Sequence, residues 1–148
     1  MAPLIALIVG TGLARLAGLV GIDALDGWQP ALRIGLALMF ALTASAHFAG
    51  GRRDDLIAMV PPRLPRPDLL VTLTGLLELA GAVALLVPAT ARWAAAALGL
   101  LMLAMFPANV SAARRRLTLA GRPVTPLAGR TALQFVFVAA AAVISFGP

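Results

Sequence analysis

The sequence predicts an all-α fold, a transmembrane helical bundle of five spans in a single membrane domain, and three observations support this prediction. Hydrophobic residues make up 61% of the 148 residues and charged residues only 12%, a composition that excludes an ordinary soluble domain. The apolar residues are gathered in runs of about 20, the length at which a helix crosses a hydrocarbon core of about 30 Å. All twelve basic residues are arginines, and most lie between those runs. This position indicates that they set the orientation of the spans in the membrane and do not form a nucleic-acid-binding surface.

Each predicted span follows from one apolar run. The first run contains Arg15 and lacks the small-residue cleavage site of a secretory signal, so we read it as a span. In the fourth run, Pro107 removes a backbone donor and predicts a kink. Residues 49–67 hold four arginines and four prolines, and they predict a short interfacial helix that Pro61 ends. The five spans are Pro3–Ile22, Ala31–Phe48, Asp68–Pro88, Trp93–Ser111 and Arg130–Phe146.

The arginines alternate between loops, and this alternation predicts the orientation in the membrane. The loops after the first and third spans hold only Arg92, whereas those after the second and fourth hold Arg52, Arg53, Arg63, Arg66, Arg114, Arg115, Arg116 and Arg122. Because basic residues in short loops are retained in the cytoplasm, we expect a cytoplasmic N-terminus and a C-terminus outside. The arginine-rich loops would then face anionic lipids or acidic partners.

Glu78 is the one carboxylate inside the third apolar run. An ionised side chain at the bilayer midplane costs at least about 2.5 kcal/mol, so we expect partners from other spans. Counting about 1.5 Å per residue from the cytoplasmic ends places Glu78 at about 15 Å, Arg15 at about 18 Å and Arg33 at roughly 22 Å. We therefore predict a structural ion pair of Glu78 with Arg33 or Arg15. Small residues on the same helix face, Gly75 among them, predict that Glu78 faces protein.

A second polar group is expected near the cytoplasmic ends of four spans, two to three turns from Glu78, where it could line a cavity. Its members are His47, Asp68, Thr72, Asn109, Arg130 and Gln134. The lone histidine and the lack of any cysteine make a metal site improbable. Met102 and Met105 share the face of Asn109, and they either pack the core or form the wall of a pocket for an apolar ligand. The predicted ligand pocket consists of Arg33, His47, Glu78, Met102, Met105, Asn109 and Gln134.

Four pieces between Arg33 and Asn109 resemble the DoxX family of small bacterial membrane proteins. They are RIGLALMFALTASAHF, MVPPRLPRPDLL, TGLLELAGAVALLVP and MLAMFPANV, in that order. The resemblance implies a DoxX-like four-helix core made by the second to fifth spans, with the first span as an addition. It also implies a multi-pass protein of the bacterial inner membrane.

Two functions remain open at this point, with a third as a weaker alternative. The small size and the lack of a recognisable catalytic set favour an accessory or assembly subunit of a membrane complex, working with a membrane or peripheral protein partner or as a homo-oligomer. The resemblance implies a quinone-linked oxidoreductase subunit with an intramembrane pocket around Glu78. The chain supplies no cofactor of its own, so the expected ligand is a bound quinone or lipid. A small-molecule transporter would need inverted repeats, which are not seen.

Overall fold

The structure, a computed structural model, describes residues 1–119 and 121–147; Ala120, in the predicted second basic loop, and Pro148 lie outside the described residues. It confirms an all-α helical bundle with five helices long and apolar enough to cross a membrane. The chain is therefore a multi-pass membrane protein. The elements are α1 (Ala2–Leu19), η1 (Asp23–Leu25), α2 (Trp28–Phe48), α3 (Gly50–Met59), α4 (Pro67–Leu86), α5 (Pro88–Arg114), β1 (Thr118–Leu119), β2 (Arg122–Pro123) and α6 (Leu127–Phe146).

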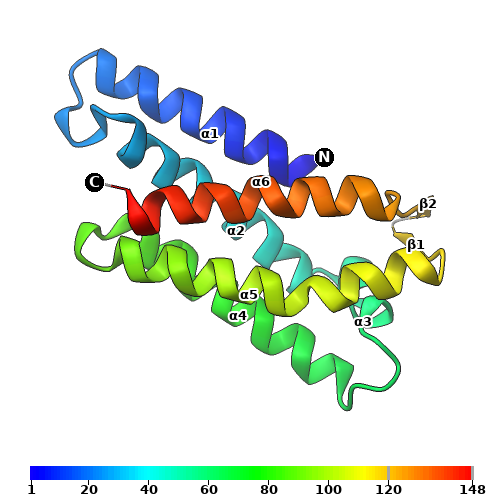
Figure 1. The fold of residues 1–148 in the computed structure, drawn as a ribbon. Coiled ribbons are helices and arrows are strands. Elements are labelled where there is room, and N and C mark those ends of the chain that lie inside the picture. The colour runs from blue at the N-terminus through cyan, green and yellow to red at the C-terminus, as the bar shows by residue number, and fades with distance from the viewer. Residues whose placement is uncertain (120, 148) are drawn as a thin grey trace.

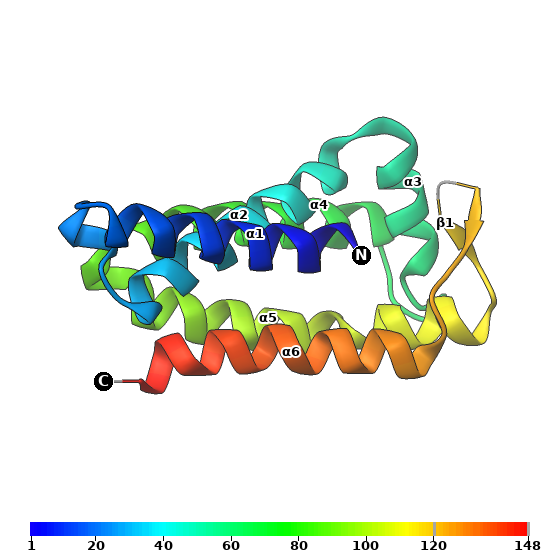
Figure 2. The ribbon, with the colours of Figure 1, turned by 90° about the horizontal axis from the view of Figure 1, so that it is seen from above.

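The long helices form two groups that pack on each other. α2 lies between α1 and α4 (Figure 1), while α5 and α6 run together along the other side of the molecule (Figure 2). The short helix α3 and the β1–β2 hairpin lie together at one end, which we call the α3 end. The connection through η1 and the C-terminus lie at the opposite end, the η1 end.

The centre of the bundle is filled by large apolar side chains from α2, α4 and α5. The largest fully buried ones are Leu36, Met39, Phe40, Leu85 and Leu98. They belong to one continuous cluster that α6 completes with Ala141 and Ile144. Many other leucines and valines of the spans are exposed, as expected where lipid is the solvent.

The helix boundaries differ from the predicted spans at several ends, and most of all where α4 meets α5. Only Val87 separates α4 from α5, and Pro88 begins α5 where the sequence had suggested that it closes the third span. Proline is favoured in the first turn of a helix because its missing N–H has no partner there in any case. Residues 89–92, which the predicted spans leave as a loop, are accordingly helical. At its other end α5 continues to Arg114, and the second basic loop forms a small antiparallel hairpin.

Glycines allow close contact between α2 and its neighbours. A Cβ atom placed on Gly75 of α4 would lie 2.5 Å from Cβ and 2.8 Å from Cγ of His47. A Cβ atom on Gly10 of α1 would lie 3.0 Å from Cα of Gly35. The two distances to His47 are shorter than real Cβ contacts, and the distance to Gly35 is tighter than nearly all of them. Glycine therefore lets α2 approach α4 and α1 closely.

Candidate functional site

Glu78 is buried between α2 and α4, where it contacts two polar side chains of α2. The hydroxyl of Thr43 donates to Oε2 of Glu78 at 2.7 Å. Nε2 of His47 lies 3.6 Å from Oε1, and the side chains of His47 and Glu78 are only 8% and 4% exposed. The predicted inward orientation of Glu78 is therefore what the structure shows.

The tautomer of His47 follows from its other contact. Nδ1 lies 2.8 Å from the carbonyl oxygen of Val71. A carbonyl can only accept a hydrogen bond, so Nδ1 carries a proton and Nε2 is the nitrogen that faces Glu78. The hydroxyl of Thr74 lies 3.3 Å from the same Nδ1 and also donates within α4. The ring is thus held by α4 on one side and offers Nε2 to the carboxyl group on the other.

Arg53 of α3 fixes the end of α2 that carries His47. One of its terminal nitrogens donates to the carbonyl oxygen of His47 at 2.9 Å. The other donates to the hydroxyl of Thr72 at 2.9 Å and to the carbonyl oxygen of Asp68 at 3.1 Å. Carbonyls in the last turn of a helix lack partners inside that helix, so this guanidinium satisfies the end of α2 and ties it to the first turns of α4.

The His47–Glu78 pair opens into a cavity of about 530 Å³ between α2, α3, α4 and α5. Fourteen of its twenty lining residues are apolar. The six polar ones are Thr43, His47, Thr74, Glu78, Asn109 and Arg130. A cavity of this size and composition, with a few convergent polar groups, is typical of sites for small ligands.

The second polar group forms at the rim of this cavity, though not with all of its predicted members. Arg130 of α6 donates to Oδ1 of Asn109 at 2.6 Å and to the carbonyl oxygen of Thr125 at 3.1 Å. Gln134 instead donates to the carbonyl oxygen of Met102 at 2.7 Å, next to the carbonyl of Leu103 that Pro107 leaves without a helical donor. Gln134 therefore joins α6 to α5 one turn before Pro107 and does not line the cavity.

The structure divides the predicted pocket residues into two sets. His47, Glu78, Met105 and Asn109 line the cavity. Met102 is buried in the apolar core, and Gln134 contacts its carbonyl oxygen. Arg33 contacts the other end of α4. The pocket is therefore smaller than predicted and lies closer to α3.

The predicted ion pair of Glu78 with Arg33 or Arg15 is corrected by the structure. Arg33 donates to the carbonyl oxygens of Leu85 and Leu86 at 3.0 and 3.3 Å. These carbonyls belong to the last turn of α4, which has no helical donors for them, and a guanidinium fork satisfies both. Arg15 pairs with Asp26 at 2.9 Å, and its guanidinium carbon lies 5.8 Å from the centre of the Trp28 ring. Both arginines thus act near the η1 end.

Three members of the site were missed by sequence reasoning. Thr43 precedes His47 by four residues, and Thr74 precedes Glu78 by four. Residues four apart share a helix face, so each chemically active side chain has a threonine one turn away, and this repeated spacing was the available signal. Arg53 could not be separated from the other arginines of the basic loop by sequence alone.

The arrangement is suited to hydrogen bonding and proton exchange, and the described residues do not form a metal centre. Within residues 1–119 and 121–147 there is no group of three or more His, Cys, Asp or Glu side chains that could hold a metal ion. The side chains that face the cavity donate and accept hydrogen bonds, and one shared proton between His47 and Glu78 would leave the pair without net charge.

Comparison with protein families gives a match. A protein family described as "Domain of unknown function (DUF8561)" matches residues 36–145. No curated protein and no solved structure matches the chain. The predicted DoxX resemblance is therefore wrong: the apolar pieces that suggested it consist mostly of Leu, Ala and Gly, which membrane helices of many kinds contain.

Proposed function

The chain belongs to the DUF8561 family, and from the site itself we propose that this member binds a small, uncharged amphiphile inside the membrane. The observation that supports the proposal is the cavity of about 530 Å³, whose mostly apolar wall converges on the buried His47–Glu78 pair. The ligand would have an apolar body and a head with hydrogen-bonding oxygens, a class to which quinones and uncharged lipids belong.

The polar groups of the cavity suggest how the head would be held. Nε2 of His47, the carboxyl group of Glu78 and the hydroxyl of Thr43 meet at one place, so donors and acceptors are both present there. A negatively charged head would be repelled by Glu78 when the carboxyl group is ionised. An uncharged carbonyl or hydroxyl head can form a hydrogen bond with the pair whether the shared proton is on His47 or on Glu78.

Mass spectrometry of the protein purified in mild detergent tests this proposal, with organic extraction to identify any bound molecule. Met105→Trp places a large ring in the cavity that Met105 lines. Leu73→Trp is the matched control, because Leu73 is 50% exposed on α4 and does not line the cavity. We expect a bound amphiphile in the wild type and in the control, and its loss in Met105→Trp. Wild-type protein without a bound small molecule, or equal retention in both variants, contradicts the proposal.

A second proposal is an accessory role beside another membrane protein, and the exposure of α6 favours it. Only 11% of the apolar window of this helix is buried, the lowest share of the five spans. Phe135 and Phe146 are 75% and 82% exposed, and large aromatic side chains are common at helix contacts. Affinity purification in mild detergent tests this role. A stoichiometric protein partner supports it, and recovery of the chain with lipid alone contradicts it.

The orientation is part of the proposal. We place the α3 end in the cytoplasm, because the two arginine-rich connections lie there and basic residues of short loops are retained on that side. The cavity would then open near the cytoplasmic surface of the membrane. A bacterial inner membrane is the proposed location, and it is tested by fractionation of the native host.

A further inference from the structure

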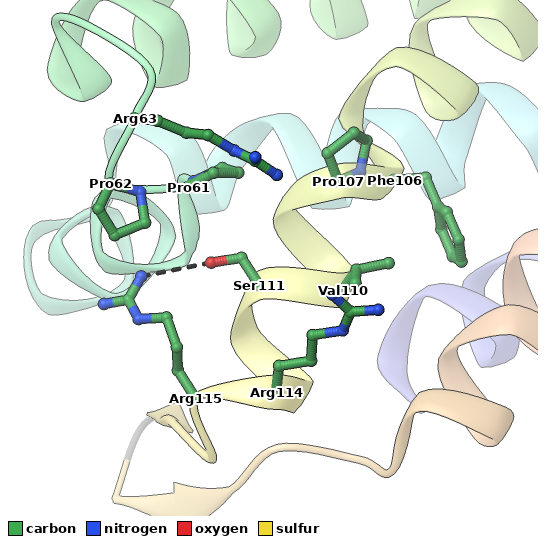
Figure 3. A pocket seen from close by; sticks show the side chains of 9 residues that line it. All are labelled: Pro61, Pro62, Arg63, Phe106, Pro107, Val110, Ser111, Arg114 and Arg115. Atoms are coloured by element: carbon green, nitrogen blue, oxygen red, sulfur yellow. Dashed lines mark hydrogen bonds between the residues drawn. The ribbon is translucent and has the colours of Figure 1, made fainter.

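A second pocket lies at the α3 end, on the outer side of α5, and its polar lining is entirely basic apart from one serine. Its volume is about 590 Å³. It lies between the proline-rich connection after α3 and the last turns of α5 (Figure 3). The lining residues are Pro61, Pro62, Arg63, Phe106, Pro107, Val110, Ser111, Arg114 and Arg115.

The three arginines of this pocket have different roles. Arg115, directly after α5, donates to the carbonyl oxygen of Ala58 in α3 at 2.9 Å and to the hydroxyl of Ser111 at 3.3 Å (Figure 3). It therefore holds α3 against α5. Among the described residues, no hydrogen bond or ion pair involves the guanidinium group of Arg63 or Arg114. Both are exposed, so two guanidinium groups remain available for an anion.

Beyond the pocket, apolar residues continue along the same face of α5. Leu100, Leu103, Pro107 and Val110 follow one another at intervals of three or four residues and so share one helix face. Leu100 and Leu103 are 68% and 53% exposed. An anion held at the arginines would therefore stand at the top of an exposed apolar stripe in a helix long enough to span the membrane. A free phosphate ion would not contact that stripe, whereas an acyl chain would pack along it.

We propose that this pocket binds an anionic phospholipid, with the headgroup phosphate between Arg63 and Arg114 and an acyl chain along the stripe of α5. Guanidinium groups bind phosphate oxygens with paired, charge-assisted hydrogen bonds. No acidic side chain lines the pocket to compete for them. This site is separate from the His47–Glu78 cavity, with which it shares only Pro61 and Pro107.

Native mass spectrometry of the delipidated full-length protein, titrated with phosphatidylglycerol and with phosphatidylcholine, tests the proposal. We expect the wild type to prefer phosphatidylglycerol. One basic group near an anionic headgroup changes lipid binding by about fivefold. The preference should therefore fall roughly thirtyfold in Arg63→Gln/Arg114→Gln, which removes two such groups. Arg63→Lys/Arg114→Lys should keep part of the preference, because the charge remains and the paired hydrogen bonds do not.

The matched control is Arg52→Gln/Arg122→Gln, which removes the same charge from residues that do not line the pocket. Equal loss of preference in this control, or an unchanged preference in Arg63→Gln/Arg114→Gln, overturns the proposal. Inorganic phosphate is the second arm: if it displaces phosphatidylglycerol at equal concentration, the site binds a soluble anion and the lipid assignment is wrong. Leu100→Gln/Leu103→Gln should weaken lipid binding and leave any phosphate binding unchanged. The unfolding midpoint of each variant shows that it is folded.

Discussion

Removing one member of the buried His47–Glu78 pair should destabilise the protein far more than a substitution that keeps its hydrogen bonds. At 3.6 Å, opposite charges attract by ~5 kcal/mol with an effective dielectric constant of about 20, and desolvation offsets much of this. Stranding one buried partner typically costs about 3 kcal/mol or more, which we expect for Glu78→Leu and for His47→Leu. Glu78→Gln keeps an oxygen for Thr43 and an N–H group for Nε2 of His47, so it should cost only about 1 kcal/mol.

The measurement is the free energy of unfolding in mixed micelles with a rising fraction of denaturing detergent, followed by the helical circular dichroism signal. The double variant His47→Leu/Glu78→Leu leaves neither polar group stranded. Its cost should therefore be smaller than the sum of the two single costs by about 2 kcal/mol. The reasoning is refuted if the single costs simply add, or if Glu78→Gln is as destabilising as Glu78→Leu.

Three further predictions test the packing, the corrected ion pair and the orientation. Gly75→Ala should cost about 1–3 kcal/mol in the same unfolding assay, because its methyl group would meet His47. Gly99→Ala is the control: its new Cβ would lie 3.7 Å from Cβ of Ala141, an ordinary contact, so it should not show this loss of stability. Asp26→Asn should cost less than about 1 kcal/mol of stability, since this carboxylate is 63% exposed. The stability cost of Arg15→Gln should simply add to that of Glu78→Leu in the double variant. A coupling energy above about 1 kcal/mol between the two substitutions would support the Arg15–Glu78 ion pair after all. Because the chain has no cysteine, an impermeant maleimide applied to spheroplasts should label Ala24→Cys and Ala89→Cys but reach Gly51→Cys only after permeabilisation; the opposite labelling reverses the proposed orientation.

The spans were predictable because each depends on a local property of the sequence. A run of about 20 apolar residues makes a spanning helix whatever its neighbours do, and the five predicted runs correspond to α1, α2, α4, α5 and α6. The connection at Pro88 was not predictable with the same certainty, because a proline both ends one helix and begins the next. In the structure the second effect decides, and α5 begins there.

The partners of Glu78 were not predictable, because they depend on how α2 crosses α4. Counting residues from one plane assumes that all spans end at that plane, and this placed His47 two to three turns from Glu78. The structure brings them to 3.6 Å, since α4 extends past the end of α2 toward the α3 end. Gly75 permits this crossing by leaving room for the ring of His47. Arg33, by the same geometry, meets the last turn of α4.

Two prolines help to form the two hollow sites at the α3 end. Pro61 and Pro107 line both the cavity and the arginine pocket. Pro61 follows closely on the end of α3, and its fixed φ angle and missing N–H prevent the helix from continuing across the gap. Pro107 removes a hydrogen bond from α5 at the same level, so the last turns of α5 need not follow the line of its first turns. The connection after α3 and the last turns of α5 therefore leave a space between them, and the cavity and the arginine pocket lie on this space.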